Sequence, residues 1–400
     1  METITICFLL YFISHCSCTR LQEATINTFN VMNYGAIGDG RKDDSQSFLK
    51  AWSKVCSTKN TIATLKVPPG KTFMLSPLQF SGPCYFSSVH FQLEGKIVAP
   101  NNKEAWKGKD EDFQTWIQFS NVNGLIINGG GQIDGGGYVW WNSCKGESCG
   151  RPTALHIHKC NNFQLHDTHH LNSAKNHISI NSSNNTHIFN VTITAPQDSP
   201  NTDGIDISQS SHILIQHSTI ATGDDCIAIN THTSNINITG VTCGPGHGIS
   251  IGSLGEKGSY GIVEQVHVSH CSFKGAKNGM RIKTWQGGFG YVRNILFEHI
   301  LLTNTGNPII IDQDYEGVNE EEKKQESAIH ISGVTYRDVQ GTSISEIAIN
   351  LNCGEGAGCN NIFMDAINII SASSGSKVRA SCNNAHGIAA STSPHISCLS

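Results

Sequence analysis

Six side chains that can transfer protons or carry charge lie in four short motifs between residues 201 and 283. The motifs are N-T-D-G-I at 201–205, G-D-D-C at 223–226, G-H-G at 246–248 and R-I-K at 281–283. The six side chains are Asp203, Asp224, Asp225, His247, Arg281 and Lys283. Paired carboxyl groups can hydrolyse a glycosidic bond, because one protonates the leaving oxygen while the other activates water. Like charges held close together raise one pKa, which keeps the acid protonated.

A cation site is the second chemistry open to these residues, because clusters of carboxylate oxygens hold Ca²⁺. His247 is a poor ligand for Ca²⁺, and Arg281 and Lys283 would repel the ion. We therefore favour hydrolysis, with no metal and no other cofactor. A plainer interpretation is that Asp203 and Asp225 only cap turns, but this explains one motif more easily than four motifs in phase.

Each motif lies just before or within a short run that alternates apolar and polar residues, as a strand with one buried face does. These runs begin at Ile205, Ile227, Ile249 and Met280, with spacings of 22, 22 and 31 residues. Similar runs lie at 155–157, 178–180, 309–311, 329–331 and 347–349. A repeat of this length with polar turns predicts an all-β, parallel β-helix, with coils about 4.8 Å apart.

The register of the repeat brings the motifs together. Asp203, Asp225 and His247 each precede the first apolar residue of their run by two positions, so we expect them to stack at one corner. Arg281 and Lys283 alternate with apolar residues and should point outward near that corner.

The chain reads as one domain over residues 24–400, because the repeat runs too continuously to place a boundary. Apolar residues in the segment 45–55 recur at helical spacing, and we expect this amphipathic helix to cap the first coil. The last coils are expected to continue to about Ala372. The charged run 320–326 is interpreted as a solvated loop.

Two other patterns resemble binding sites but are explained more simply. The glycine-rich segment 123–137 lacks the Lys-Ser/Thr of a phosphate-binding loop, so we interpret it as turns. Trp140 and Trp141 after it are expected to pack or to line a cleft. Five histidines lack the spacing of metal ligands and are interpreted as solvated strand faces: His156, His158, His166, His169 and His170.

The N-terminus predicts secretion. Residues 4–13 form an apolar run too short to anchor the chain in a bilayer, and we interpret residues 1–23 as a signal peptide. Twelve cysteines follow it, an even number suited to disulfides, and N-x-S/T sequons lie at Asn181, Asn184, Asn190 and Asn237. We therefore expect an extracellular or cell-wall protein, free of the membrane after cleavage. The net charge of −5 argues against nucleic acid as a partner.

The four motifs, in this order and at these spacings, resemble the signatures of the polygalacturonases, pectin hydrolases with a right-handed parallel β-helix fold. The similarity to the plant branch runs from about Phe29 to the C-terminus. It implies that Asp224 is the general acid, that Asp203 and Asp225 position and deprotonate water with inversion at the anomeric carbon, and that His247 holds their protonation state.

The resemblance also implies a substrate and three disulfides. Arg281 and Lys283 would bind the galacturonate carboxylate of pectin, and Tyr315 would line the same subsite. The implied disulfides are Cys226–Cys243, Cys353–Cys359 and Cys382–Cys398, and the other six cysteines stay unassigned. We expect a monomer.

Two alternatives of different kinds stay open from the sequence. One is a pectate lyase, which cleaves the same polymer by Ca²⁺-assisted elimination. The other is a noncatalytic wall-binding protein of the same fold. The sequence does not decide between endo and exo action, nor does it show a preference for methyl-esterified pectin.

Overall fold

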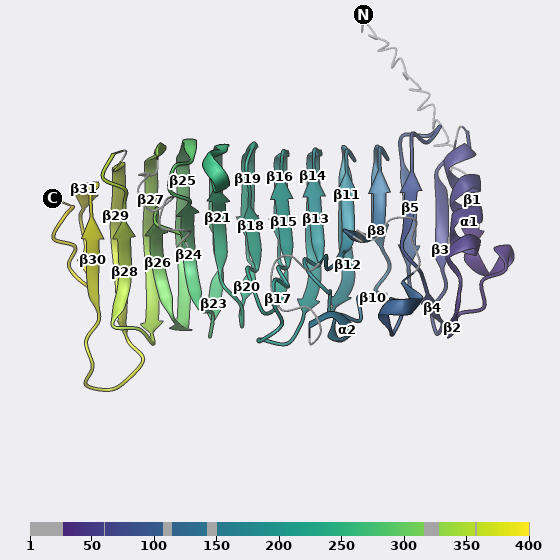
Figure 1. Cartoon of the computed structure of the whole chain (residues 1–400), viewed down its shortest axis with the longest axis horizontal. Coiled ribbons are helices and arrows are strands. Elements are labelled where there is room, and N and C mark those ends of the chain that lie inside the picture. The colour runs from purple at the N-terminus through teal and green to yellow at the C-terminus, as the bar shows by residue number, and fades with distance from the viewer. Residues whose placement is uncertain are drawn as a thin grey trace, which may run out of the picture.

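A computed structural model describes residues 27–59, 61–106, 114–141, 150–315, 328–356 and 358–399. The expected signal peptide, Cys144, Cys149 and the charged run 320–326 lie outside these residues. The chain forms a right-handed parallel β-helix whose coils lie side by side along one axis, from the purple N-terminal end to the yellow C-terminal end (Figure 1). The predicted fold class is confirmed.

One face of the helix, here called sheet 1, contains eleven strands within the described residues, each paired in parallel with its neighbours. Its strands are β5 (Leu78–Ser81), β8 (Thr115–Ser120), β11 (Thr153–His158), β13 (Ile178–Asn181), β15 (Ile205–Ser208), β18 (Ile227–Ile229), β21 (Ile249–Leu254), β24 (Asn278–Thr284), β26 (Asn307–Asp312), β28 (Ile347–Asn352) and β30 (Arg379–Asn383).

The other strands form sheet 2, which covers the two remaining sides of each coil. Its first side contains β1 (Asn27–Asn30), β3 (Ala63–Val67), β6 (Val89–Leu93), β9 (Leu125–Asn128), β16 (Ser211–Gln216), β19 (Thr233–Thr239), β22 (Tyr260–Ser269) and β31 (Ala385–Ala389). Its second side contains β2 (Asp39–Asp43), β4 (Thr72–Met74), β7 (Lys96–Val98), β10 (Gln132–Asp134), β17 (Thr219–Ala221), β20 (Thr242–Cys243), β23 (Ser272–Lys274) and β32 (Thr392–Ser393). Five long strands pair with both sides, namely β12 (Phe163–Leu171), β14 (Asn184–Thr194), β25 (Phe289–Thr305), β27 (Ala328–Ser343) and β29 (Cys359–Ser371).

The register of sheet 1 is the predicted one. Ile205 pairs with Ile227, Ile227 with Ile249, and Ile249 with Met280. These four side chains are fully buried and form one apolar row of the core. The outward positions between them are therefore aligned as well, which is how the fold positions the charged residues.

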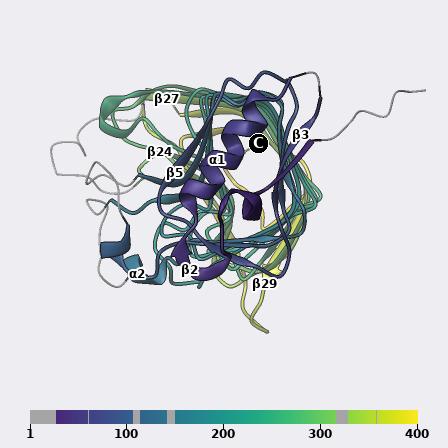
Figure 2. The ribbon, with the colours of Figure 1, turned by 90° about the vertical axis from the view of Figure 1, so that its right-hand side faces the viewer.

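Helices are few and lie away from this row. The predicted cap is α1 (Ser45–Ser57), whose Phe48, Ala51, Trp52 and Val55 are buried. It lies across the open end of the first coils (Figure 2). A second helix, α2 (Tyr138–Trp141), and three 3₁₀ turns complete the described elements, at η1 (Val31–Tyr34), η2 (Lys103–Ala105) and η3 (Glu256–Gly258). None of the described helices is long and apolar enough to cross a membrane.

Three details differ from the sequence predictions. The coils continue beyond Ala372, to β32. The run 329–331 belongs to sheet 2 rather than to the row of Ile205, because a strand in any side of a coil has the same alternation. His170 is buried in the core, where its Nε2 lies 3.0 Å from the Thr168 hydroxyl, so it is not on a solvated face.

The three predicted disulfides are present, together with Cys56–Cys84. Cys160 and Cys271 are buried free thiols, so the even count did not mean that every cysteine is paired. Of the sequon asparagines, Asn184, Asn190 and Asn237 are exposed. Asn181 is half-buried, and its amide donates to the Ser208 hydroxyl at 2.9 Å.

Candidate active site

The first three motifs occupy the turns that lead into sheet 1. We call residues 201–204, 222–226 and 244–248 the entry corner. Backbone hydrogen bonds join its successive coils: Gly204 N–H donates to Asp225 C=O and Cys226 N–H donates to Gly248 C=O, both at 2.8 Å. The predicted stacking of Asp203, Asp225 and His247 follows from this alignment.

The backbone of the entry corner approaches its neighbours too closely for side chains at certain glycines. A Cβ at Gly223 would lie 2.0 Å from the Ser199 carbonyl oxygen, and one at Gly248 would lie 2.3 Å from that of Gly279. Gly248 also has φ of +94°, a region that glycine adopts without strain. The disulfide Cys226–Cys243 joins this corner to the end of β20. The glycines and the disulfide therefore fix the backbone positions from which the acidic side chains extend.

Asp225 is the most constrained carboxylate of the site. Its Oδ1 accepts from the Ser250 hydroxyl at 2.8 Å and from Arg281 Nη2 at 2.6 Å, and its Oδ2 accepts from Lys283 Nζ at 2.9 Å. The side chain is 1 % exposed. Burial by itself would raise the pKa of Asp225, but Arg281 and Lys283 outweigh it and hold the pKa below its usual range. Asp225 is therefore ionised.

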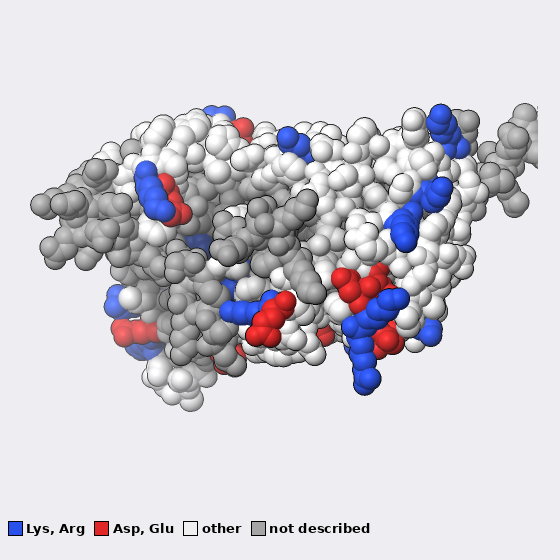
Figure 3. Space-filling model, turned by 45° about the vertical axis from the view of Figure 1, so that its right-hand side comes forward, with Lys and Arg blue, Asp and Glu red and all other residues white. Residues whose placement is uncertain are grey.

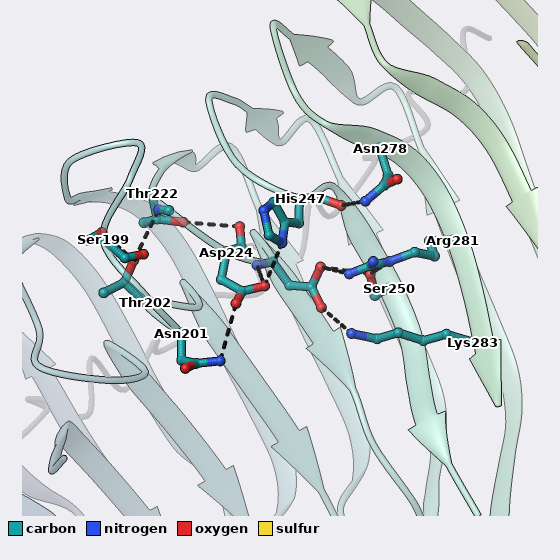
Figure 4. Close-up of polar contacts among 12 residues, drawn as sticks. Ser199, Asn201, Thr202, Thr222, Asp224, His247, Ser250, Asn278, Arg281 and Lys283 are labelled. Carbon is teal, nitrogen blue, oxygen red and sulfur yellow. Dashed lines mark hydrogen bonds and ion pairs between the residues drawn. The ribbon is translucent and has the colours of Figure 1, made fainter. Parts of the chain in front are cut away.

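Asp224 has a different set of partners from Asp225. Its Oδ1 lies 2.8 Å from His247 Nδ1 and accepts from the Asp225 N–H at 2.9 Å. His247 is fixed in turn by its own N–H, which donates to the Asp224 carbonyl at 2.7 Å. Figure 4 shows the His247 ring directed at Asp224, with Arg281 and Lys283 reaching in from the neighbouring strand. One carboxyl is thus paired with a histidine and the next with two permanent cations.

Two residues absent from the sequence prediction support Asp224. The Asn201 amide lies 3.5 Å from Asp224 Oδ2, and its carbonyl oxygen accepts from Arg151 Nη2 at 2.5 Å. Arg151 also donates to the Pro200 carbonyl at 2.7 Å. Arg151 lies about fifty residues before the motifs, and no local pattern marks it, so sequence reasoning missed it.

A fourth carboxyl group, Asp206, was also missed. It occupies an outward position of β15 and lies in the same row as Ser250 and Arg281, through the pairs Asp206–Ala228, Ala228–Ser250 and Ser250–Arg281. The alternation I-D-I-S would have placed it there. Burial, then the charge of Asp225, raises the pKa of Asp206 to about 7.

The pKa of Asp203 is also raised well above its usual value, by burial first and then by Asp206, Asp224 and Asp225. Carboxyl groups this close titrate together rather than one by one. The corner therefore retains at least one proton at mildly acidic pH, while Asp225 stays charged.

Arg281 and Lys283 lie on the outer face of sheet 1, as predicted, but they are 8 % and 7 % exposed rather than open to solvent. Both lie near the Tyr315 ring, with Arg281 Cζ 6.0 Å and Lys283 Nζ 5.0 Å from its centroid. Arginine has five N–H donors and lysine three, more than their contacts with Asp225 and Ser250 use. The three predicted binding residues are thus neighbours, and the pair retains donors for an anion.

A metal is a poor fit for this arrangement. Ligand atoms of Asp224, Asp225 and His247 lie within 4.8 Å of one another. Asp225 is already neutralised by two cations, and the set mixes a ring nitrogen with two carboxylates, which is unlike an oxygen cage for Ca²⁺. On the face shown in Figure 3, charged side chains form small mixed patches rather than one continuous field. Binding of a charged polymer would therefore depend on local contacts.

Comparisons with known proteins point to one family. A family model described as glycosyl hydrolases family 28 matches residues 56–397. A probable polygalacturonase of Arabidopsis thaliana is 48 % identical over 377 residues, which cover 93 % of this chain and 81 % of the relative. A polygalacturonase of Prunus persica is 40 % identical over 93 % of each chain.

Solved structures agree on the fold. An endo-xylogalacturonan hydrolase from Aspergillus tubingensis superposes with a TM-score of 0.79 at 24 % identity, over 90 % of this chain and 96 % of that one. A polygalacturonase from Erwinia carotovora superposes with a TM-score of 0.71 at 24 % identity, over the same shares.

Proposed function

This chain belongs to glycosyl hydrolases family 28 and is a glycoside hydrolase, and we propose that it is a polygalacturonase that hydrolyses the α-1,4-galacturonosidic bonds of pectin. The observation that carries the proposal is the pair of adjacent carboxyl groups in opposite surroundings. Asp224 is hydrogen-bonded to His247, while Asp225 is bound to Arg281 and Lys283. Two adjacent carboxyl groups with such different partners are suited to separate roles in acid–base hydrolysis.

We assign the acid to Asp224. His247 Nδ1 lies 2.8 Å from Asp224 Oδ1. Among the described residues, the hydrogen-bond partner of Asp224 Oδ2 is the Asn201 amide at 3.5 Å, a weak contact that leaves Oδ2 open to donate a proton to the glycosidic oxygen. Asp225, ionised by its two cations, orients the attacking water, and Asp203 and Asp225 together accept its proton. The raised pKa of Asp203 supports a shared proton in the cluster.

The stereochemical outcome follows from how Asp225 is held. Inverting glycosidases usually separate their carboxyl groups by about 6.5–9.5 Å, and retaining ones by about 5–5.5 Å. Oxygens of Asp224 and Asp225 lie within 4.8 Å, so distance alone favours retention. Three hydrogen bonds occupy both oxygens of Asp225, however, and a carboxylate so neutralised is a poor nucleophile. We therefore propose that water, and not Asp225, attacks the anomeric carbon and inverts it.

The substrate carboxylate is bound by Arg281 and Lys283, with Tyr315 beside them. Both cations can retain Asp225 and still donate to a second anion, because each has more donors than its present contacts use. A galacturonate bound here would have its carboxylate against the cations and its ring close to the acid pair. The net charge of −5 makes such short-range contacts necessary.

The chain as a whole fits a secreted enzyme of the cell wall. We propose that residues 1–23 direct export and that residues 24–400 form one catalytic domain that acts as a monomer. Four disulfides among the described residues are typical of an oxidising compartment.

One digestion of polygalacturonic acid tests the proposal. We expect reducing-sugar release at mildly acidic pH that persists with a chelator, and proton NMR of the first product should show the β-anomer that inversion of an α-linkage leaves. An initial α-anomer would assign Asp225 as a nucleophile. Products that absorb in the ultraviolet, with activity lost to the chelator, would indicate a lyase, and no release would indicate a wall-binding protein. The size profile of the products separates endo from exo action.

A further inference from the structure

His177 lies outside the four motifs, at the turn into β13, one coil before Asp203. It precedes Ile178, which pairs with Ile205 in sheet 1. Its side chain is 0 % exposed, so it cannot contact a substrate in the groove. A fully buried imidazole costs stability unless both ring nitrogens have partners.

Both ring nitrogens of His177 have partners. The N–H of Ser173 donates to Nε2 at 3.2 Å, and Nδ1 lies 3.0 Å from the carbonyl oxygen of Asp203. A backbone N–H can only donate, so Nε2 must be the acceptor. Nδ1 therefore carries the hydrogen and donates it to Asp203. These two contacts define a neutral imidazole in one tautomer, and the backbone of Thr194 and of Thr202 also lies near the ring.

The peptide that follows Asp203 is held at both ends. Its carbonyl accepts a second hydrogen bond, from the His177 N–H at 2.8 Å, and its N–H, on Gly204, donates to the Asp225 carbonyl at 2.8 Å. His177 thus binds the backbone of Asp203, and the Asp203–Gly204 peptide in turn binds the backbone of Asp225. Rotation of this peptide would move the Asp203 side chain relative to Asp225.

We propose that His177 is a positioning residue of the hydrolysis: its neutral imidazole fixes the Asp203–Gly204 peptide and so sets the placement of the Asp203 carboxyl against Asp225. This rests on the proposed function, in which these two residues orient the attacking water. A displacement of about 1 Å at such a group is enough to slow a reaction strongly. Burial lowers the pKa of His177 to about 4, so the ring keeps this tautomer at mildly acidic pH.

Two substitutions separate the two ring contacts. In His177→Asn the amide nitrogen is attached to Cγ, as Nδ1 is, and can still donate to the Asp203 carbonyl. In His177→Gln the amide reaches the Ser173 N–H but leaves no donor beside Asp203. His170→Gln is the matched control, because His170 is an equally buried histidine near His177 that bonds to Thr168 rather than to Asp203.

Steady-state kinetics on polygalacturonate and a thermal melt should be measured for each variant. We expect His177→Gln to lower kcat by about five- to fiftyfold, the cost of one lost buried hydrogen bond, with KM unchanged. His177→Asn should retain most of kcat, and His170→Gln should lower the melting temperature only. The inference would be overturned if His177→Gln and His177→Asn lost kcat equally, or if His177→Gln kept a normal kcat.

A measurement on the unaltered protein covers the case in which a variant does not fold. Histidine ¹⁵N NMR should show His177 with Nδ1 protonated and Nε2 bare, and with no titration between pH 5 and 8. The opposite tautomer, or protonation near pH 6.5, would overturn the inference. An unaltered protein that releases no sugar would instead refute the proposed function, and the NMR result would stand apart from it.

Discussion

Arg281→Lys tests whether the guanidinium fork, and not only the positive charge, is needed. Arg281 donates through Nη2 to Asp225 at 2.6 Å and through Nε to the Ser250 hydroxyl at 2.9 Å. A lysine has one nitrogen and cannot reproduce both bonds. At least one of these two bonds, both made by a charged donor, is therefore lost at a residue that is 8 % exposed.

A hydrogen bond to a charged group contributes about 1.5–3 kcal/mol. This corresponds to a roughly ten- to hundredfold lower kcat/KM, because each 1.4 kcal/mol is a factor of ten. Lys283→Ala should cause a loss of similar size, since Lys283 Nζ bonds to Asp225 at 2.9 Å. Both binding and turnover should fall, because the two cations contact Asp225 and, under the proposed function, also bind the substrate carboxylate.

The matched control is Arg293→Lys. Arg293 forms a similar pair with Glu264, at 2.7 Å, but its side chain is 49 % exposed, and exposed ion pairs contribute about 0–1 kcal/mol. The kcat/KM of the Arg293→Lys variant should therefore equal that of the unaltered protein.

The assay compares unesterified with fully methyl-esterified polygalacturonate, and the loss should be larger on the unesterified polymer. A normal kcat/KM for Arg281→Lys on that polymer would refute the reasoning. An equal loss on both polymers would mean that the cations do not bind the substrate carboxylate.

Three further predictions can be checked with simple measurements. The asparagine of Asp224→Asn cannot act as the acid, so turnover should fall by at least about 10²-fold while calorimetry still detects substrate binding. The control is Asp198→Asn, because Asp198 is exposed on the preceding turn. Normal turnover in Asp224→Asn would mean that another residue is the acid. The pKa of Asp206 is raised in the folded state, so the folded form binds more protons than the unfolded chain between about pH 4 and 7 and loses stability as pH rises through that window. Asp206→Asn should therefore increase the melting temperature more at pH 8 than at pH 4, unlike the control Asp338→Asn, whose carboxyl has a lowered pKa. An equal increase at both pH values would argue against a raised pKa of Asp206. Circular dichroism should show mostly strand, and helix above about one third would contradict the β-helix.

The sequence by itself determined the fold class, the register of sheet 1 and the three clustered motifs. Buried residues recur every second position within a strand, and the first buried residues of three successive strands are each 22 residues apart. Ile205, Ile227 and Ile249 could therefore be aligned without coordinates, and Asp203, Asp225 and His247 were aligned with them. Helix α1 could also be predicted from the sequence, because its apolar residues recur at a helical period.

The tertiary structure decided the contacts between side chains from different coils. Coil length varies, so the alternation at 329–331 could not show which face it belonged to. Only the fold pairs Asp225 with Arg281 and Lys283, and it alone brings in Arg151 and His177 from earlier coils.

The pairing of the cysteines was likewise decided by distance in space. The even count indicated disulfides but left six cysteines unassigned, and two of those six, Cys160 and Cys271, are buried free thiols. The physical reason is common to these cases: local periodicity reports which side of a strand is buried, whereas a hydrogen bond, ion pair or disulfide depends on which residues the coils stack together.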